Sequence, residues 1–340
     1  SSSSSSSSFI SSLLNLSKSP SRGETARGVA SSSHCSLAPF ILSLDPALSS
    51  HKLTVSFDGL HWSKPFLLDQ VGSATIELEL GDEANSRACS SLGSAPLLEF
   101  AAQLELGRKL QSSYVRTLSI VPRLTIVNLS SFNIDVAQAD TDARWFRSLS
   151  STSLSSRKCS FHWEDGTKPK ALTLRGTGRR DAWSGRLSVD LLGSFPLRVP
   201  VAGAGAGAGA GGYANLKVEI RSHGPSTRVI VSEEDRKHPD ILLVNKLSRS
   251  LLLAAQLSSR DPVSVKPLEE EIFCWSEPHE QQLISLCVKE GNGEDRIAAE
   301  EEEMGEEELV TVDVEQIGSV LTIRNNIIAR VTTRGPTRVV

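Results

Sequence analysis

The chain has 340 residues, a net charge of −4, 39% hydrophobic residues and 22% charged residues, enough for two or three globular domains. This balance gives no positive field that would favour nucleic acid. The five cysteines form no C-x-x-C pair, which argues against a disulfide framework or a structural zinc site and favours a reducing compartment. No stretch approaches the ~20 apolar residues of a membrane span, and the serine-rich start lacks the apolar core of a signal peptide. Because the first residue is not methionine, we expect a piece of a longer polypeptide.

The chain divides into a serine-rich tail at 1–36, which is too polar to offset its ordering entropy and is expected to be disordered, and a long region of strands. Side chains alternate between apolar and polar in short runs, and no long segment has helical periodicity with caps at both ends. The runs that carry this pattern are Leu53–Phe57, Ser73–Leu80, Pro96–Leu106, Tyr114–Ile120, Arg123–Asn128, Ile134–Gln138, Lys170–Arg175, Arg186–Asp190, Leu216–Arg221 and Thr227–Val231.

Several landmarks return after about 110 to 120 residues, a period that suits a small β-domain used in tandem. Asn128 and Gln138 return as Asn245 and Gln256, in each case after a strand-like run. The other recurring pairs are Trp62-Ser63 with Trp183-Ser184, Phe161-His162-Trp163 with Phe273-Cys274-Trp275, and Gly224-Pro225 with Gly335-Pro336.

These patterns predict an all-β fold of tandem antiparallel β-sandwich repeats, each about 110–120 residues long, with disordered inserts. We expect the end of one repeat at 37–117, a complete repeat at 118–232 and a further repeat at 233–340. An Ala/Gly insert at 202–212 and an acidic insert at 290–308 are read as solvated loops. The third repeat lacks a Trp-Ser pair after the acidic insert, so its second half is expected to be shortened.

The order of these landmarks resembles the adaptor-binding repeat region of the vacuolar protein sorting 13 family, the bridge-like lipid transfer proteins of the chorein group. The residues that carry the resemblance are Pro122, Arg123, Asn128, Gln138, Phe161-His162-Trp163, Trp183-Ser184-Gly185, Gly193 and Gly335-Pro336-Thr337-Arg338. It covers roughly Leu53 to Val340 and none of the lipid-conducting groove.

The resemblance implies a non-catalytic segment that docks short proline-containing motifs of adaptor proteins and so recruits a lipid transfer protein to organelle membrane contact sites. It implies a cytoplasmic protein, peripheral at organelle membranes, without cofactors. One asparagine per repeat is tied to adaptor binding in the family, which makes Asn128 and Asn245 the candidate adaptor-binding residues. An asparagine before a turn can equally hold the fold, since its amide satisfies neighbouring backbone groups. Both interpretations stay open on sequence grounds.

The tryptophans Trp62, Trp163, Trp183 and Trp275 are expected in the core, because a tryptophan that recurs once per β-unit is usually structural. An aromatic groove for a proline-rich peptide is the alternative, and edge strands beside the asparagines are the better candidates for pairing with a ligand strand.

Other signals are weak. Cys159 and His162 have no second pair that would complete a metal site. An arginine cluster that includes Arg175 and Arg186 is a candidate contact for acidic lipid headgroups or a solvated face. No catalytic motif occurs, and paired carboxylates for a carbohydrate-active β-sandwich do not recur, so that function ranks behind adaptor docking and behind a purely structural β-repeat scaffold.

Overall fold

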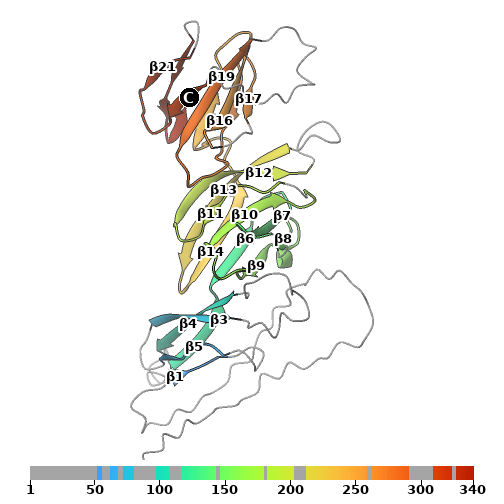
Figure 1. The fold of residues 1–340 in the computed structure, drawn as a ribbon, viewed down its shortest axis with the longest axis vertical. Helices are drawn as coiled ribbons and strands as arrows, with labels where there is room; N and C mark the ends of the chain where they lie inside the picture. The colour runs from blue at the N-terminus through green and yellow to red at the C-terminus, as the bar shows by residue number, and fades with distance from the viewer. Residues whose placement is uncertain are drawn as a thin grey trace, which may run out of the picture. The chain divides into compact units, whose positions relative to one another are not determined.

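A computed structural model describes residues 52–55, 62–67, 72–79, 97–106, 116–142, 146–179, 182–202, 212–258, 262–290, 309–323 and 327–340 (Figure 1). The predicted tail at 1–36 and nearly all of the two predicted inserts lie outside these residues. The chain forms two compact units, residues 1–120 and residues 121–340. Apart from one short 3-10 turn, η2 (Leu154–Ser156), every regular element in the described part is a β-strand, so the predicted all-β fold is confirmed.

The first unit contains two small sheets. Strands β1 (Lys52–Leu53) and β2 (Phe66–Leu67) pair antiparallel, and a second sheet has the order β3-β4-β5. Its strands are β3 (Gly72–Glu79), β4 (Leu97–Leu106) and β5 (Arg116–Pro122). Alternation drives the local structure, because Ile76 and Leu78, two residues apart, are both 2% exposed while their neighbours face away.

The second unit contains two β-sandwiches, which we call module A (residues 121–234) and module B (residues 235–340). In module A one sheet has the order β11-β10-β7-β8 and the other the order β12-β13-β14-β6-β9. The bounds are β6 (Leu124–Asn128), β7 (Ile134–Gln138), β8 (Phe146–Leu149), β9 (Lys158–Phe161), β10 (Ala171–Gly176), β11 (Leu187–Ser188), β12 (Gly193–Val201), β13 (Gly212–His223) and β14 (Ser226–Glu233).

Module B repeats this topology with one difference in its second sheet. Its first sheet, β20-β19-β16-β17, matches β11-β10-β7-β8, and its second, β18-β15-β24-β23, matches β9-β6-β14-β13. A separate ribbon of β21 and β22 occupies the place of β12 and the start of β13. The bounds are β15 (Ile241–Val244), β16 (Ser250–Gln256), β17 (Val263–Val265), β18 (Glu270–Ile272), β19 (Leu283–Glu290), β20 (Val310–Asp313), β21 (Val320–Thr322), β22 (Ile328–Arg330), β23 (Thr332–Arg334) and β24 (Thr337–Val339). The second half of module B is therefore complete in topology, although its strands are short.

One parallel pairing marks both modules. Strand β14 runs parallel to β6, and β24 runs parallel to β15, whereas the other paired strands of unit 2 are antiparallel. The chain enters β14 and β24 through the repeated Gly-Pro turn, where Gly224 and Gly335 have φ of 59° and 63°. A left-handed first residue followed by proline suits a two-residue hairpin, which explains why this dipeptide recurs.

Three strands of module A were not predicted. Strands β8 and β9 are short and mostly polar, and β12 contains Pro196 and Pro200. Proline is tolerated in β12 because β13 is the one ladder partner of this strand in the described part of the chain, so β12 is an edge strand of its sheet.

Candidate functional site

Asn128 lies at the end of β6 and is fully buried, with both donors and the oxygen of its amide hydrogen-bonded. The Asn128 Nδ2 donates to the carbonyls of Phe132 (2.8 Å) and Leu149 (3.3 Å). Its Oδ1 accepts from the backbone N–H (3.0 Å) and the hydroxyl (2.7 Å) of Ser130. Because Leu149 ends β8, this one side chain closes its own turn and ties the two sheets of module A together.

Asn245 repeats this arrangement in module B. The side chain is 3% exposed, and its Nδ2 donates to the carbonyls of Ser250 (2.8 Å) and Val265 (2.9 Å). Its Oδ1 accepts from the N–H of Leu247 (3.0 Å). Val265 ends β17, the counterpart of β8. Both amides are therefore buried and bonded to the backbone of their own module, which is the geometry that suits a fold-holding side chain.

The recurring glutamines form a second clamp. Gln138 Nε2 donates to the carbonyl of Asp165, and the N–H of Asp165 donates back to Gln138 Oε1, both at 2.9 Å. Gln256 makes the same pair of bonds with Glu277, both at 2.8 Å. Each clamp fixes the chain two residues after a buried tryptophan.

Trp163 and Trp275 are core residues, each 2% exposed. Each packs edge-on against the phenylalanine two positions earlier, with ring centroids 5.4 Å apart for Phe161–Trp163 and 5.1 Å for Phe273–Trp275.

The Trp-Ser motif works through its serine, which corrects the expectation of a core position for Trp62. Trp62 is 56% exposed, whereas Ser63 is 5% exposed. Ser63 binds Val55 twice: its N–H donates to the Val55 carbonyl (2.9 Å), and its Oγ accepts from the Val55 N–H (3.0 Å). Adjacent residues of an extended chain face opposite ways, so burying the serine turns the tryptophan outward.

Ser184 makes the same two bonds to Leu174, at 2.7 and 2.9 Å. Its neighbour Trp183 is half-buried, not in the core, and lies against the guanidinium of Arg175, 4.1 Å from the ring centroid. Arg175 also pairs with the buried Asp135 at 3.2 Å. This arginine of the predicted basic cluster is thus engaged inside the protein, whereas Arg186 is exposed and pairs with Asp140 at the surface at 2.7 Å.

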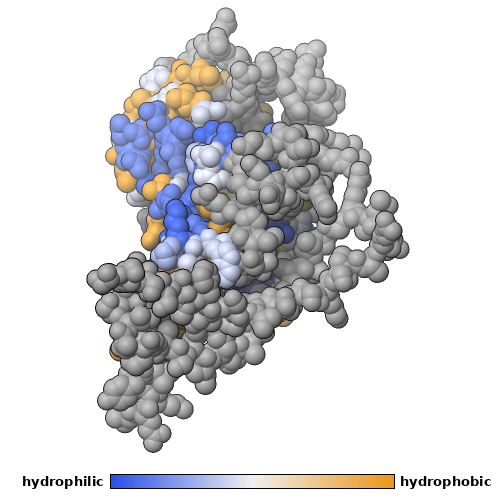
Figure 2. Space-filling view, turned by 60° about the horizontal axis from the view of Figure 1, so that its bottom comes forward, coloured by the Kyte–Doolittle hydropathy of each residue, from blue (hydrophilic) through white to orange (hydrophobic). Residues whose placement is uncertain are grey.

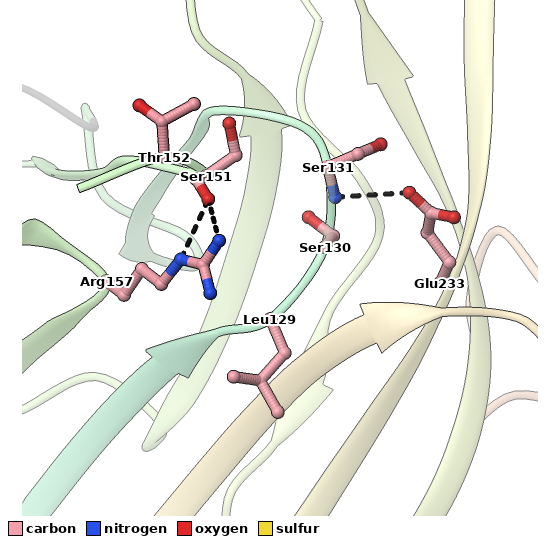
Figure 3. Close-up of a pocket in the computed structure, with 7 residues that line it drawn as sticks. All are labelled: Leu129, Ser130, Ser131, Ser151, Thr152, Arg157 and Glu233. Carbon is pink, nitrogen blue, oxygen red and sulfur yellow. Dashed lines mark hydrogen bonds between the residues drawn. The ribbon is translucent and has the colours of Figure 1, made fainter. Parts of the chain in front are cut away.

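An open hollow of about 440 Å³ lies beside the Asn128 turn (Figure 3). It is built from the turn after β6, the β8–β9 loop and the end of β14. Its lining residues are Leu129, Ser130, Ser131, Ser151, Thr152, Arg157 and Glu233. Asn128 does not line this hollow, but its amide oxygen holds the lining residue Ser130 in place through two hydrogen bonds. No repeated sequence landmark falls on Arg157 or Glu233, so sequence reasoning missed both.

Opposite charges face each other across the hollow. Arg157 is held by the Ser151 carbonyl, which accepts from Nε (2.8 Å) and from Nη2. Glu233 Oε1 accepts from the N–H of Ser131 (3.1 Å). Side-chain and backbone hydrogen bonds from Ser131 lower the pKa of Glu233, so this carboxylate is ionised at neutral pH.

Modules A and B join along the free edge of β12. The N–H of Arg198 donates to the Trp275 carbonyl (2.8 Å), and the N–H of Trp275 donates to the Pro196 carbonyl (3.3 Å). The N–H of Gly185 donates to the Ser276 carbonyl (3.1 Å), at a point where a Cβ on Gly185 would lie 2.2 Å from that oxygen. Tight backbone approach explains why glycine follows the Trp-Ser pair of module A.

Two of the described cysteines, Cys159 and Cys274, have protonated thiols. Burial raises the pKa of Cys159 to about 11 and that of Cys274 well above its usual range, so both thiols stay protonated. No group of three or more His, Cys, Asp or Glu side chains with metal-binding geometry occurs among the residues described. Within the same ranges, no helix is long and apolar enough to cross a membrane.

Exposed apolar side chains on the described surface are scattered. Figure 2 shows hydrophobic residues in several separate groups among hydrophilic ones. Large exposed examples include Leu129 (55%), Leu192 (61%) and Ile317 (60%), which belong to different turns. Hydrophobicity alone therefore does not single out a docking face.

A family model described as "Vacuolar-sorting associated protein 13, adaptor binding domain" matches residues 11–282, most of the chain. The match includes all of module A and ends within module B, one residue before β19 begins. No curated protein matches the sequence.

Proposed function

Because the chain belongs to the vacuolar-sorting associated protein 13 adaptor-binding-domain family, we propose that it docks adaptors by capturing an extended, proline-containing segment beside Asn128 or Asn245. The adaptor-binding role follows from the family. The proline-containing segment and its place beside the asparagines are our proposal.

One observation supports this placement above the others. The side chain of Asn128 makes four hydrogen bonds and that of Asn245 three, and each thereby shapes a surface turn next to an edge strand; in module A that turn lines the hollow. Among the described strands, β9 and β18 each have a ladder partner on one side only, so a peptide could pair with either by main-chain hydrogen bonds. Proline suits such a ligand, because its fixed φ reduces the entropy lost on binding.

The test blocks each turn separately. Ser131→Arg places a long side chain at the Asn128 turn, and Ser248→Arg does so at the Asn245 turn. Both serines are exposed, and so is Ser155, whose variant Ser155→Arg lies outside the hollow and serves as the matched control. Peptides selected from a displayed library of proline-containing sequences should lose affinity at least about tenfold for one turn variant and not for the control.

A purely structural scaffold is the second candidate, favoured by the backbone pairing between β12 and Trp275. It predicts that no peptide is selected on the intact chain, or that selected peptides bind all three arginine variants equally. Either result would remove the docking proposal.

We further propose that docking brings a bridge-like lipid transfer protein to organelle contact sites. A fluorescent fusion of the chain should collect at an organelle surface and disperse when the peptide-blocking arginine is introduced. Contact with acidic lipid headgroups remains a weaker proposal, since Arg175 and Arg186 already pair with Asp135 and Asp140. Binding to vesicles of anionic lipid, unaffected by the turn variants, would favour the lipid contact instead.

A further inference from the structure

The rims of the two asparagine turns carry different chemistry at matching positions. Backbone bonds establish the match: the N–H of Asn128 donates to the carbonyl of Arg157 (2.7 Å), and that of Asn245 donates to the carbonyl of Glu269 (3.0 Å). A cation in module A thus stands where module B has an anion. The residue after each asparagine differs as well, since Leu129, 55% exposed, corresponds to the exposed Lys246.

The guanidinium of Arg157 is preorganised to bind an anion. Two of its nitrogens bind the Ser151 carbonyl, which fixes the plane of the guanidinium, and the third is on the side of Leu129 in Figure 3. A half-buried, oriented guanidinium loses less side-chain entropy on pairing than a mobile surface arginine does.

Glu233 defines the opposite side of the hollow. Its bond from the Ser131 N–H keeps it in place, and its lowered pKa keeps it charged. An acidic group entering the hollow is therefore drawn toward Arg157 and repelled from Glu233, which sets one orientation for a bound chain. Leu129 lies on the wall between these two charges and offers apolar surface to a neighbouring side chain (Figure 3).

We propose that the Asn128 hollow selects an extended peptide in which an acidic side chain stands next to an apolar one, the acid on Arg157 and the apolar group on Leu129. The inference rests on the proposed docking function and adds the specificity of the site. The Asn245 turn, with Glu269 and Lys246 at the matching positions, disfavours the same peptide. The two modules are therefore unequal docking sites.

The experiment uses the full chain and a displayed peptide library with one fixed proline and randomised neighbours. The readout is the ratio of acidic to basic residues among selected peptides. We expect about fivefold enrichment of acidic residues on the unmodified chain, the factor that a partly exposed ion pair of ~1 kcal/mol supplies. The enrichment should vanish with Arg157→Gln, which keeps a donor for the Ser151 carbonyl, and reverse with Arg157→Glu.

Two controls guard against indirect effects. Arg147→Glu changes the net charge equally at an exposed residue of β8 that does not line the hollow, and it should leave the enrichment unchanged. Arg157→Lys keeps the charge and should retain a preference for acidic residues, while thermal melting verifies that each variant folds.

The outcomes separate the two proposals. Peptides selected without a preference for acids, or with one that survives Arg157→Gln, overturn this inference and leave adaptor docking standing. An empty selection on the unmodified chain overturns adaptor docking, and this inference with it.

Discussion

Modules A and B close their asparagine turns with equivalent bonds, while the surfaces around those turns have diverged. Asn128 and Asn245 each bind the backbone of their own turn and the last residue of a strand in the facing sheet. Arg157 and Glu269, whose carbonyls accept hydrogen bonds from the backbone N–H groups of these asparagines, have opposite charges. What recurs is therefore the hydrogen-bonded frame, and what varies is the surface at which we propose that a partner binds.

A second difference concerns the serine of the Trp-Ser pair and its two hydrogen bonds to a neighbouring strand. In module A, Leu174 pairs with Val136 of β7 on one side, and Ser184 supplies its hydrogen bonds on the other side, beyond the end of β11. In module B, the equivalent Leu286 pairs directly with Val310 of β20. A regular strand thus replaces a motif, which shows that the Trp-Ser pair is one of two ways to cover the same sheet edge.

Replacing the asparagines should have the largest effect on stability and tests whether the two turns are equivalent. Asn128→Ala should lower the free energy of unfolding by about 3 kcal/mol, because two buried carbonyls lose their donor and Ser130 loses its acceptor. Asn245→Ala should behave alike. Asn128→Asp, which keeps the acceptor and loses both donors, should be nearly as damaging, as measured by thermal melting. Unchanged melting in all three variants would mean that the amides serve a ligand and not the fold.

A substitution at the junction between modules A and B should have the next largest effect on stability. Gly185→Ala puts a Cβ against the Ser276 carbonyl and should cost about 2 kcal/mol, confined to the junction. Hydrogen exchange should then speed up at the amides of Arg198 and Trp275. The matched variant Gly176→Ala instead strikes Val201 within module A and should spare those two amides until module A itself opens. Equal exchange patterns for the two variants would contradict a junction held by this contact.

The glutamine clamps should contribute less, about 1.5 kcal/mol each, because the backbone groups that they bind lie near solvent. Gln138→Ala and Gln256→Ala should have similar effects on urea unfolding. Gln138→Glu, which keeps the acceptor for the Asp165 N–H and loses the donor, should fall between the native chain and the alanine variant. A large effect for one glutamine and none for the other would show that the repeated bonds are not equivalent.

A pH effect at the junction should be the smallest. Burial against Phe195, at 4.7 Å between ring centroids, lowers the pKa of His279. Neutral His279 is therefore favoured by folding, and its contribution is present above about pH 6.5 and lost as the pH falls below it. Junction amides should exchange faster at pH 5.5 than at pH 7.5, and His279→Gln should reduce that difference. His238→Gln, at an exposed site, should leave it intact.

The sequence was sufficient to predict most of the frame, because period-2 alternation and recurring polar residues report directly on strands and buried bonds. Strands β10, β13 and β14 were placed by alternation, and the recurring asparagines by their place before a turn. The role of Trp62 was misjudged because a repeated Trp-Ser pair does not reveal which of its two residues is buried.

The rim of the site could not be predicted in the same way. Arg157 stands in an irregular loop, and it becomes the counterpart of Glu269 only through the bond that its carbonyl accepts from Asn128. Glu233 reaches the hollow because β14 pairs in parallel with β6, a long-range register that alternation does not encode. Surface chemistry of this kind depends on tertiary pairing, so it emerges only with the fold.

The most direct measurement is the solvent exchange of the side-chain amide protons of Asn128 and Asn245, followed by NMR on asparagine-labelled chain with and without a selected peptide. Slow exchange of both amides in the free chain, little changed by the peptide, is the result that a fold-holding role requires. Fast exchange in the free chain that slows only when the peptide binds would contradict it, and would make the asparagines contact residues.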